Sequence, residues 1–261
     1  MIPSALEHLE EISGRSDPIA VFLDYDGTLT PIVSRPEDAW LSESTRQALR
    51  DLVTRAPVAI LSGRDLNDVR CRVDIGRIVY AGSHGFDIAG PGELRRELGA
   101  EYLPELDGAE KELHQALGAL PGEQLERKRF SIAAHYRNVK DNDVHKVTRA
   151  VETVAARHPE LRRINGKKVY ELLPGIDWDK GEAMKWLLDT LGLDHKNVRP
   201  IYIGDDITDE DASRALERSG IGILVSEQSQ RTAARYSLSD PAEVEQFLRA
   251  LTRHVSTPGR S

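Results

Sequence analysis

Short apolar runs that end in polar or glycine-containing turns recur along the chain, and each leads into a segment with helical spacing. The run at 19–23 stops at DYDGT, the run at 57–61 stops at SGR, and the run at 201–203 stops at GDD. Strands that are apolar on both sides and alternate with helices indicate a parallel sheet covered on both faces. Ligands of such sheets bind beyond the carboxyl ends of the strands. The pattern therefore predicts an α/β fold with a site where these three runs end.

Residues 84–172 follow a different pattern. Helical spacing around 113–120 and 144–155 alternates with two strand-like stretches, at 125–139 and 166–174. In the first of these stretches Ile132 and Ala134 share one face, whereas Ser131 and His135 share the other. We therefore predict a Rossmann-like parallel-sheet core with an inserted α+β domain. The core is expected to comprise 1–83 and 173–261, and the insertion 84–172.

Composition and charge narrow the classes of protein that fit. The 261 residues are 39% hydrophobic and 30% charged, which is typical of a soluble globular protein. A net charge of −8 argues against nucleic acid as a partner, because phosphate neutralisation needs surplus Lys and Arg. The single cysteine, Cys71, allows no internal disulfide and fits a reducing compartment. No signal peptide or membrane-length apolar run is evident, so we expect a cytoplasmic protein with no membrane or obligatory protein partner.

The DYDGT stretch places two carboxylates at the end of a buried strand. Asp24 and Asp26 are two residues apart and point the same way, so their charges repel unless a cation or a proton intervenes. Carboxylate oxygens suit Mg²⁺, and Asp205 at another strand end is a candidate for a further ligand. Asp206 and Asp209 are candidates for positioning Asp205 and its waters. The alternative interpretation is an ordinary Asp-rich turn after a strand.

A carboxylate pair with Mg²⁺ suits phosphoryl transfer. Asp24 would attack phosphorus and form an aspartyl-phosphate, while Asp26 would protonate the leaving alcohol and then activate water. Ser62, Gly63 and Arg64 have the parts of a phosphate cradle, namely a hydroxyl, a backbone that a ligand can approach, and a positive charge. A plain strand-to-helix connection with Ser62 as the cap is the alternative.

The stretch DWDKGEAMKWLLDTLG predicts a helix that begins near Lys180. A cation is disfavoured at a helix N-terminus by the helix dipole, and a nearby anion would offset that penalty. Lys180 is therefore expected to bridge Asp24 and a bound phosphate, the alternative being a solvated surface lysine. Four apolar residues form the expected buried stripe of this helix: Met184, Leu187, Leu188 and Leu191.

Four stretches in this order, DYDGT, LSGR, DK and GDDxTDED, resemble the motifs of the haloacid dehalogenase-like phosphatases. The extended forms FLDYDGTLTPIV, GSHG, ExKxFSxAxHYR, KKVYELLP and DWDKGEA are more closely similar to those of the trehalose-6-phosphate phosphatases. The resemblance implies that Asp24 is the nucleophile and Asp26 the general acid and base. It further implies that Ser62 and Lys180 hold the phosphate, and that Asp24, Asp205 and the backbone carbonyl of Asp26 bind Mg²⁺.

The same resemblance implies that the inserted segment is a cap over the site. Cap residues matching Glu126, Lys128, Arg137 and Glu171 contact the glucose rings in that subfamily, so the expected reaction is hydrolysis of trehalose 6-phosphate in trehalose biosynthesis. One departure is Leu173, in ELLP, where related sequences often carry an arginine.

Three alternatives stay open from the sequence. Another capped sugar phosphatase, acting on sucrose 6-phosphate or a glycosyl-phosphoglycerate, would have the same core motifs. A phospho-acceptor signalling domain also holds an acidic pocket and a lysine, but such domains are shorter and lack the insertion. A sugar-sensing homologue without activity is disfavoured by the complete motif set.

His84 and His135 fit either structural or site-lining roles.

Overall fold

The computed structural model describes residues 2–14, 18–193, 198–228 and 230–255. By backbone contacts the chain divides into a core unit, Met1–Arg95 with Trp178–Ser261, and an inserted unit, Arg96–Asp177. The inserted unit and the predicted insertion at 84–172 share most of their residues, and the predicted boundaries stay a prediction. Residues 84–95 include a strand that pairs with the sheet of the core unit.

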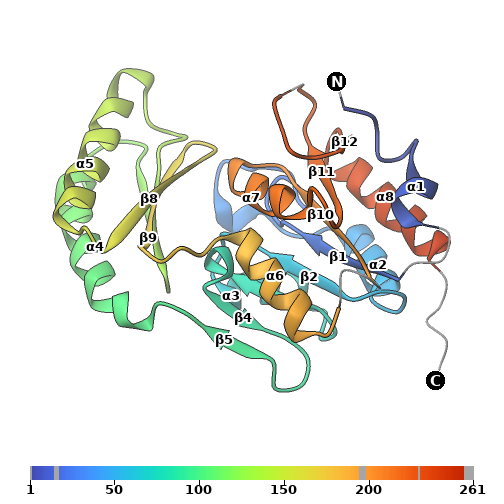
Figure 1. Ribbon diagram of the computed structural model, residues 1–261. Helices are drawn as coiled ribbons and strands as arrows, with labels where there is room; N and C mark the ends of the chain where they lie inside the picture. Colours follow the sequence, from blue (N-terminus) through green and yellow to red (C-terminus); the bar gives the residue numbers. More distant parts are fainter. Residues whose placement is uncertain (1, 15–17, 194–197, 229, 256–261) are drawn as a thin grey trace. The chain divides into compact units, whose positions relative to one another are not determined.

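An eight-stranded sheet forms the centre of the core unit, in the order β12-β11-β10-β1-β2-β3-β4-β5 (Figure 1). The strand β1 lies between β10 and β2, and all three run parallel. The strand β4 is antiparallel to β3. The strands are β1 (Ile19–Leu23), β2 (Val58–Leu61), β3 (Val79–Gly82), β4 (Asp87–Ala89), β5 (Arg95–Glu97), β10 (Arg199–Gly204), β11 (Ile221–Val225) and β12 (Tyr236–Leu238).

Helices cover both faces of this sheet (Figure 1). Val21 and Leu23 of β1 pack into a core with α2 and α8, while Phe22, which points to the opposite face, is also buried. A strand buried on both faces reads as an unbroken apolar run. The predicted α/β fold is therefore confirmed. The helices are α1 (Leu9–Ser13), α2 (Glu43–Leu52), α3 (Leu66–Val73), α6 (Lys180–Thr190), α7 (Ile207–Leu216) and α8 (Pro241–His254), with short 3₁₀ turns η1 (Pro36–Asp38) and η2 (Ser83–Gly85).

The helix α6 begins at Lys180, as expected, and ends one residue earlier than the apolar stripe predicted. Met184, Leu187 and Leu188 are buried, but Leu191 is 38% exposed. Leu191 is the C-cap of the helix, and the left-handed Gly192 then turns the chain. The prediction that Leu191 belongs to the buried stripe was therefore wrong, because the helix ends before that position can face the core.

The inserted unit packs two helices against a four-stranded antiparallel sheet in the order β6-β7-β9-β8. Ile132, Ala134 and Leu172 face the helices in one core, which leaves Ser131 and His135 on the opposite face. The predicted alternation of this strand is thereby confirmed. The elements are α4 (Leu103–Leu117), α5 (Val144–Arg157), β6 (Gln124–Lys128), β7 (Ser131–His135), β8 (Leu161–Gly166) and β9 (Val169–Pro174), with 3₁₀ turns η3 (Ala100–Tyr102) and η4 (Asp141–Asp143).

The outer edge of the core sheet is covered by the beginning of the chain. The amide of Ala5 donates to the carbonyl of Ser237 at 2.9 Å, and the amide of Ser237 donates to Pro3 at the same distance. An exposed strand edge is a template for unwanted pairing, so this segment protects β12. Among the helices in the described part of the chain, none is long and apolar enough to cross a membrane.

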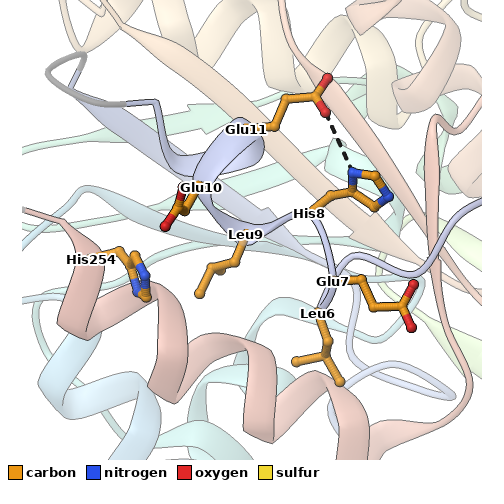
Figure 2. Close-up of a pocket in the computed structure, with 7 residues that line it drawn as sticks. All are labelled: Leu6, Glu7, His8, Leu9, Glu10, Glu11 and His254. Carbon is orange, nitrogen blue, oxygen red and sulfur yellow. Dashed lines mark ion pairs between the residues drawn. The ribbon is translucent and has the colours of Figure 1, made fainter.

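A cavity of about 610 Å³ lies beside α1 and the end of α8 (Figure 2). His8 and Glu11 form an ion pair on its wall at 3.5 Å, and His254 lines another part of it. Its lining residues come from 6–11 and 254, so it includes none of the residues predicted for catalysis.

Truncation of Phe247 tests how strongly α8 holds the sheet. This side chain is fully buried, so Phe247→Ala should lower the free energy of unfolding by about 3–5 kcal/mol through lost burial and a residual cavity. Denaturant unfolding measures the change. The neighbouring Gln246→Ala, at an exposed position of the same helix, should stay within about 0.5 kcal/mol. A similar small loss for both variants would show that the core relaxes around position 247.

Candidate active site

The turn after β1 brings Asp24 and Asp205 together. The amide of Asp24 donates to the carbonyl of Ile203 on β10 at 2.9 Å, which places the ends of the two strands side by side. Gly27 then adopts a φ of +86°, and a Cβ at this position would lie 2.1 Å from a carboxylate oxygen of Asp205. Glycine is required here both for its backbone conformation and for the close approach of Asp205.

Lys180 joins two buried carboxylates at the centre of this site. Its Nζ donates to Asp24 Oδ1 at 2.6 Å and to Asp209 Oδ1 at 2.7 Å. All three side chains are almost completely buried. The predicted contact between Lys180 and Asp24 is present, and the position of Lys180 at the first residue of α6 is explained by these two anions.

Burial and charge shift the three groups in different directions. Burial raises the pKa of Asp24 well above its usual value; the Lys180 ammonium opposes this, and the charges of Asp209 and Asp205 add to it. Burial acts against the charged form of Lys180, but Asp209 and Asp24 raise the pKa of its ammonium well above normal. Burial likewise opposes ionisation of Asp209, yet Lys180 and Tyr202 bring its pKa below normal. Negative charge on Asp24 is therefore costly beside the carboxylates of Asp209 and Asp205, and the Lys180 ammonium offsets part of that cost.

Both oxygens of Asp209 are occupied by neighbouring donors. The Tyr202 hydroxyl donates to Oδ1 at 2.5 Å, and the amides of Asp205 and Asp206 donate to Oδ2 at 2.9 Å each. Asp206 is the N-cap of α7 and forms a capping box with Asp209. Asp209 therefore holds Lys180 on one side and the loop that carries Asp205 on the other.

The carboxylates of Asp24, Asp205 and Asp209 form a possible cation site. One oxygen from each lies within 4.8 Å of the others, and all three residues are buried. Three carboxylates around one lysine leave an excess of negative charge that a divalent cation would neutralise, and oxygen donors are those that hard cations prefer. Since the oxygens of Asp209 already accept four hydrogen bonds, Asp24 and Asp205 are the better ligands. The residues present thus fit a divalent metal ion.

Ser62 and Gly63 follow β2 and lie against a backbone turn of unusual conformation. Ser83 and His84 have φ values of +47° and +58°, which residues other than glycine rarely adopt. In this conformation the amide of Ser83 donates to Arg64 at 2.6 Å and the amide of His84 donates to Ser62 at 2.9 Å. The His84 ring lies where a Cβ on Gly63 would be only 2.9 Å away. The strained turn therefore holds the Ser62 loop in place, and His84 packs against its glycine.

Arg64 is directed at Asp26. Its Nε and Nη2 donate to the two carboxylate oxygens of Asp26 at 2.7 Å each. The Asp26 side chain is 40% exposed, whereas that of Arg64 is only 8% exposed. The structure thus gives Arg64 a protein partner, and its predicted contact with phosphate stays a prediction.

The residues predicted to read a sugar lie together on one face of the inserted unit. Lys128 Nζ and Ser131 Oγ both donate to Glu171 Oε1, at 2.8 and 2.5 Å, and these three side chains are buried. Glu126 contacts His135 at 2.8 Å. Burial raises the pKa of Glu126, but the bond to His135 and the charge of Lys128 outweigh it and lower the pKa overall.

Arg137 lies in the turn that follows β7 and is exposed. Its Nη2 donates to the backbone carbonyl of Lys167 at 2.9 Å. Leu173 is 1% exposed and, by strand alternation, lies on the same face of β9 as Glu171, opposite the face on which Leu172 contacts the helices.

Some contacts of the site were not predicted from the sequence. Asp68 accepts from Arg64 and from Arg72, and Tyr202 donates to Asp209. The spacing of Arg64, Asp68 and Arg72 at i, i+4 and i+8 is a signal of ion pairs along a helix and was available in the sequence. Tyr202 gave no such signal, because it lies inside an apolar run.

The fold of this protein is shared by several solved structures of other proteins. The structure superposes on the C-terminal domain of trehalose-6-phosphate phosphatase from Candida albicans with a TM-score of 0.83 and 22% identity, covering 97% of this chain and 98% of that one. A haloacid dehalogenase-like hydrolase from Bacteroides thetaiotaomicron gives a TM-score of 0.64 at 17% identity, over 90% and 99% of the two chains. At these identities the likeness shows the fold.

The sequence model of the trehalose-phosphatase family matches residues 22–242. Trehalose 6-phosphate phosphatase RA3 of Zea mays is 41% identical over 268 residues, covering 95% of this chain and 74% of that protein. The trehalose-phosphate phosphatase of Mycobacterium tuberculosis is 43% identical over 263 residues, covering 97% and 66%. The chain belongs to the trehalose-phosphatase family, and its resemblance to that family, inferred from the motifs, is confirmed.

Proposed function

We propose that this protein hydrolyses trehalose 6-phosphate to trehalose and inorganic phosphate through an aspartyl-phosphate. The observation that carries the proposal is the buried contact of Lys180 with Asp24 and Asp209, at 2.6 and 2.7 Å. This contact holds the Asp24 carboxylate, the proposed nucleophile, next to the Lys180 ammonium, the proposed phosphate ligand, beyond the end of β1. The names of the relatives point to trehalose 6-phosphate as the substrate.

Two aspartates divide the chemistry. Asp24 Oδ attacks phosphorus as the bond to the sugar oxygen breaks, and Asp26 donates its proton to that oxygen. Asp26 then takes a proton from water as the water oxygen bonds to phosphorus and the bond to Asp24 breaks. Ser62, Gly63 and Lys180 bind the phosphoryl oxygens.

Mg²⁺ is the cofactor we propose, held by Asp24, Asp205 and the backbone carbonyl of Asp26. When bound, such an ion neutralises charge on the phosphoryl oxygens. Asp209 and Asp206 would hold the loop that presents Asp205. The proposal is supported by the hydrogen bonds from the amides of Asp205 and Asp206 to the Asp209 carboxylate.

We further propose that the insertion, predicted at 84–172, acts as a cap that reads the sugar and excludes water from the intermediate. Glu126, Lys128, Arg137 and Glu171 offer donors and acceptors for sugar hydroxyls. The bond between His135 and Glu126 favours one orientation of that carboxylate, so His135 supports the same surface.

Phosphate release from a panel of substrates tests the proposal. The panel contains trehalose 6-phosphate, sucrose 6-phosphate, glucose 6-phosphate and glucosyl-3-phosphoglycerate, each with Mg²⁺ and with EDTA. We expect a metal-dependent rate on trehalose 6-phosphate that exceeds the others by orders of magnitude. A metal-dependent preference for another member would overturn the sugar assignment and leave the role of Asp24 standing. No release from any member would overturn the proposed activity.

Removal of the Arg137 guanidinium should weaken recognition of the sugar. Arg137→Ala should raise KM for trehalose 6-phosphate by about 10- to 100-fold, the range expected for a lost hydrogen bond from a charged donor. KM for 4-nitrophenyl phosphate should stay unchanged. The matched control is Arg157→Ala, which removes an exposed arginine of α5 that pairs with Glu112 of α4. Equal effects of Arg137→Ala on both substrates would show that Arg137 does not read the sugar.

A further inference from the structure

The guanidinium of Arg64 makes four hydrogen bonds, all to the protein. Two go to the oxygens of Asp26, one goes from Nη1 to Asp68 Oδ2 at 2.7 Å, and one goes from Nη2 to the carbonyl of Pro36 at 2.8 Å. An arginine side chain has five N–H groups. This side chain is therefore almost fully committed to protein acceptors, although it is adjacent to the predicted phosphate cradle.

Arg64 is itself held by a second layer of contacts. Asp68 accepts from Arg64 through one oxygen and from Arg72 Nε through the other, at 2.8 Å. Arg72 donates in turn to the carbonyl of Ala39 at 3.0 Å and lies under the ring of Trp40. Burial opposes ionisation of Asp68, yet the two arginines lower its pKa overall, so it stays charged. Arg64 is thus fixed on the side away from Asp26 by groups anchored in α3 and in the loop that follows the nucleophile.

Among the described residues, Arg64 is the donor that fixes the Asp26 side chain. This side chain is 40% exposed, and Asp26 precedes a tight turn in which the amide of Gly27 donates to Thr30 at 2.8 Å. A half-exposed carboxylate is free to rotate about its side-chain bonds, and a paired fork of N–H groups removes that freedom. Each oxygen of Asp26 retains a lone pair that Arg64 does not occupy, which leaves room for a proton to arrive or depart.

We propose that Arg64, held by Asp68, is a positioning residue that orients the carboxyl group of Asp26 toward the leaving oxygen. The proposal rests on the assignment of Asp26 as general acid under the proposed function. It differs from the sequence-based interpretation, in which Arg64 binds the phosphate. The two roles make opposite predictions for substrates that differ only in their leaving group.

The test compares trehalose 6-phosphate, whose alcohol needs a proton to leave, with 4-nitrophenyl phosphate, whose leaving group departs without one. Rapid-quench measurement of the first turnover isolates formation of the phospho-enzyme from its later hydrolysis. The variant is Arg64→Lys, which keeps the charge and most of the volume but loses the fork. The matched control is Arg35→Lys, because Arg35 makes a similar forked pair with Asp38 at 2.9 and 3.2 Å in the exposed loop.

We expect Arg64→Lys to slow the first turnover of trehalose 6-phosphate by about 10- to 100-fold, a large part of what a general acid contributes. First-turnover release of 4-nitrophenolate should change by less than about 3-fold, as should KM for both substrates and inhibition by inorganic phosphate. Lysine is a good ligand for phosphate, so a phosphate-binding role would be largely preserved. Asp68→Asn should shift the ratio of the two rates in the same direction by a smaller factor, and Arg35→Lys should not shift it.

Equal slowing of both substrates by Arg64→Lys would overturn the proposal and show a general structural role. An unchanged ratio of the two rates, with or without weaker inhibition by phosphate, would also overturn it, and weaker inhibition would favour phosphate binding. Asp26→Asn distinguishes this failure from failure of the proposed function. If Asp26→Asn shows the difference between the substrates and Arg64→Lys does not, only the positioning role is wrong. If Asp26→Asn lacks the difference as well, the assignment of Asp26 and the positioning role are both wrong.

Discussion

Asp24→Asn should reduce kcat for trehalose 6-phosphate by at least about 10⁴-fold, by comparison with the loss of other enzymatic nucleophiles. An amide has no anionic oxygen to attack phosphorus, and it is a poor ligand for a divalent cation. The fold should survive, because the new side chain has the same shape and still offers an oxygen to Lys180. The loss should therefore appear in catalysis, with the unfolding midpoint close to that of the wild type.

Two measurements check this expectation. The first is phosphate release under saturating substrate, with Asp189→Asn as a control, since Asp189 is exposed on α6. The second is mass spectrometry of Asp26→Asn protein acid-quenched after mixing with 4-nitrophenyl phosphate, whose leaving group needs no acid. A phosphate on Asp24 should accumulate because the base for its hydrolysis is absent. Near-normal turnover by Asp24→Asn, or a phosphate found on a different residue, would disprove the role assigned to Asp24.

Lys180→Met should abolish activity and also lower the free energy of unfolding by about 3–5 kcal/mol, the cost of leaving buried charges without their partner. The ammonium contacts Asp24 and Asp209 at 2.6 and 2.7 Å, and methionine fills a similar volume without a charge. The variant therefore keeps the packing and removes the positive charge that offsets the carboxylates of Asp24 and Asp209. Activity fails as well because the phosphate loses a cationic ligand.

The pH dependence of this destabilisation has a definite sign. In the wild type the pKa of Asp209 is lowered, so its contribution to stability is present above its unfolded pKa and is lost as the pH falls through the folded pKa. In Lys180→Met the buried carboxylates prefer to bind protons, so the folded variant gains stability relative to the wild type as the pH falls from 7 toward about 5. Denaturant unfolding at several pH values measures this difference.

Lys185→Met provides the matched control for Lys180→Met. Lys185 lies on the same helix but is exposed and pairs with Glu182 at 2.7 Å, so its replacement should change stability by no more than about 0.5 kcal/mol. Lys180→Met combined with Asp209→Asn should be more stable than Lys180→Met alone, because one of the uncompensated charges is removed. If Lys180→Met were as stable as Lys185→Met, the buried pair would not carry the charge balance described above.

The parts of the site that could be predicted from the sequence are those fixed by strand ends. Asp24, Ser62 and Asp205 each follow an apolar run, and parallel strands bring their carboxyl ends to one edge. Lys180 was predictable from the conflict between its charge and the start of a helix. The polar face of β7 followed from strict alternation. These inferences needed only local patterns and the rules of α/β folds.

The partners of the side chains could not be predicted in the same way. Arg64 follows its strand as expected, but whether its guanidinium points to a ligand or to Asp26 depends on how two loops pack. The left-handed conformations of Ser83 and His84 carry no sequence signal, because glycine is the usual residue for them. Leu191 fitted the apolar period of α6, and only the observed end of the helix shows why it is exposed. Long-range packing decided each of these outcomes.

The position of β1 between β10 and β2 has a consequence for synthesis of the protein. During translation β1, the strand that precedes Asp24, emerges early. Its neighbour β10 and the lysine that contacts Asp24 belong to the last third of the chain; Lys180 and Asp24 are 156 residues apart. Pairing of such distant segments is slow, because loop-closure entropy must be overcome first. The nascent N-terminal part therefore carries Asp24 without its counterion until the ribosome has delivered α6. Two polypeptides divided within the inserted unit would each hold part of the candidate active site, so activity on mixing them would report directly on assembly of the sheet.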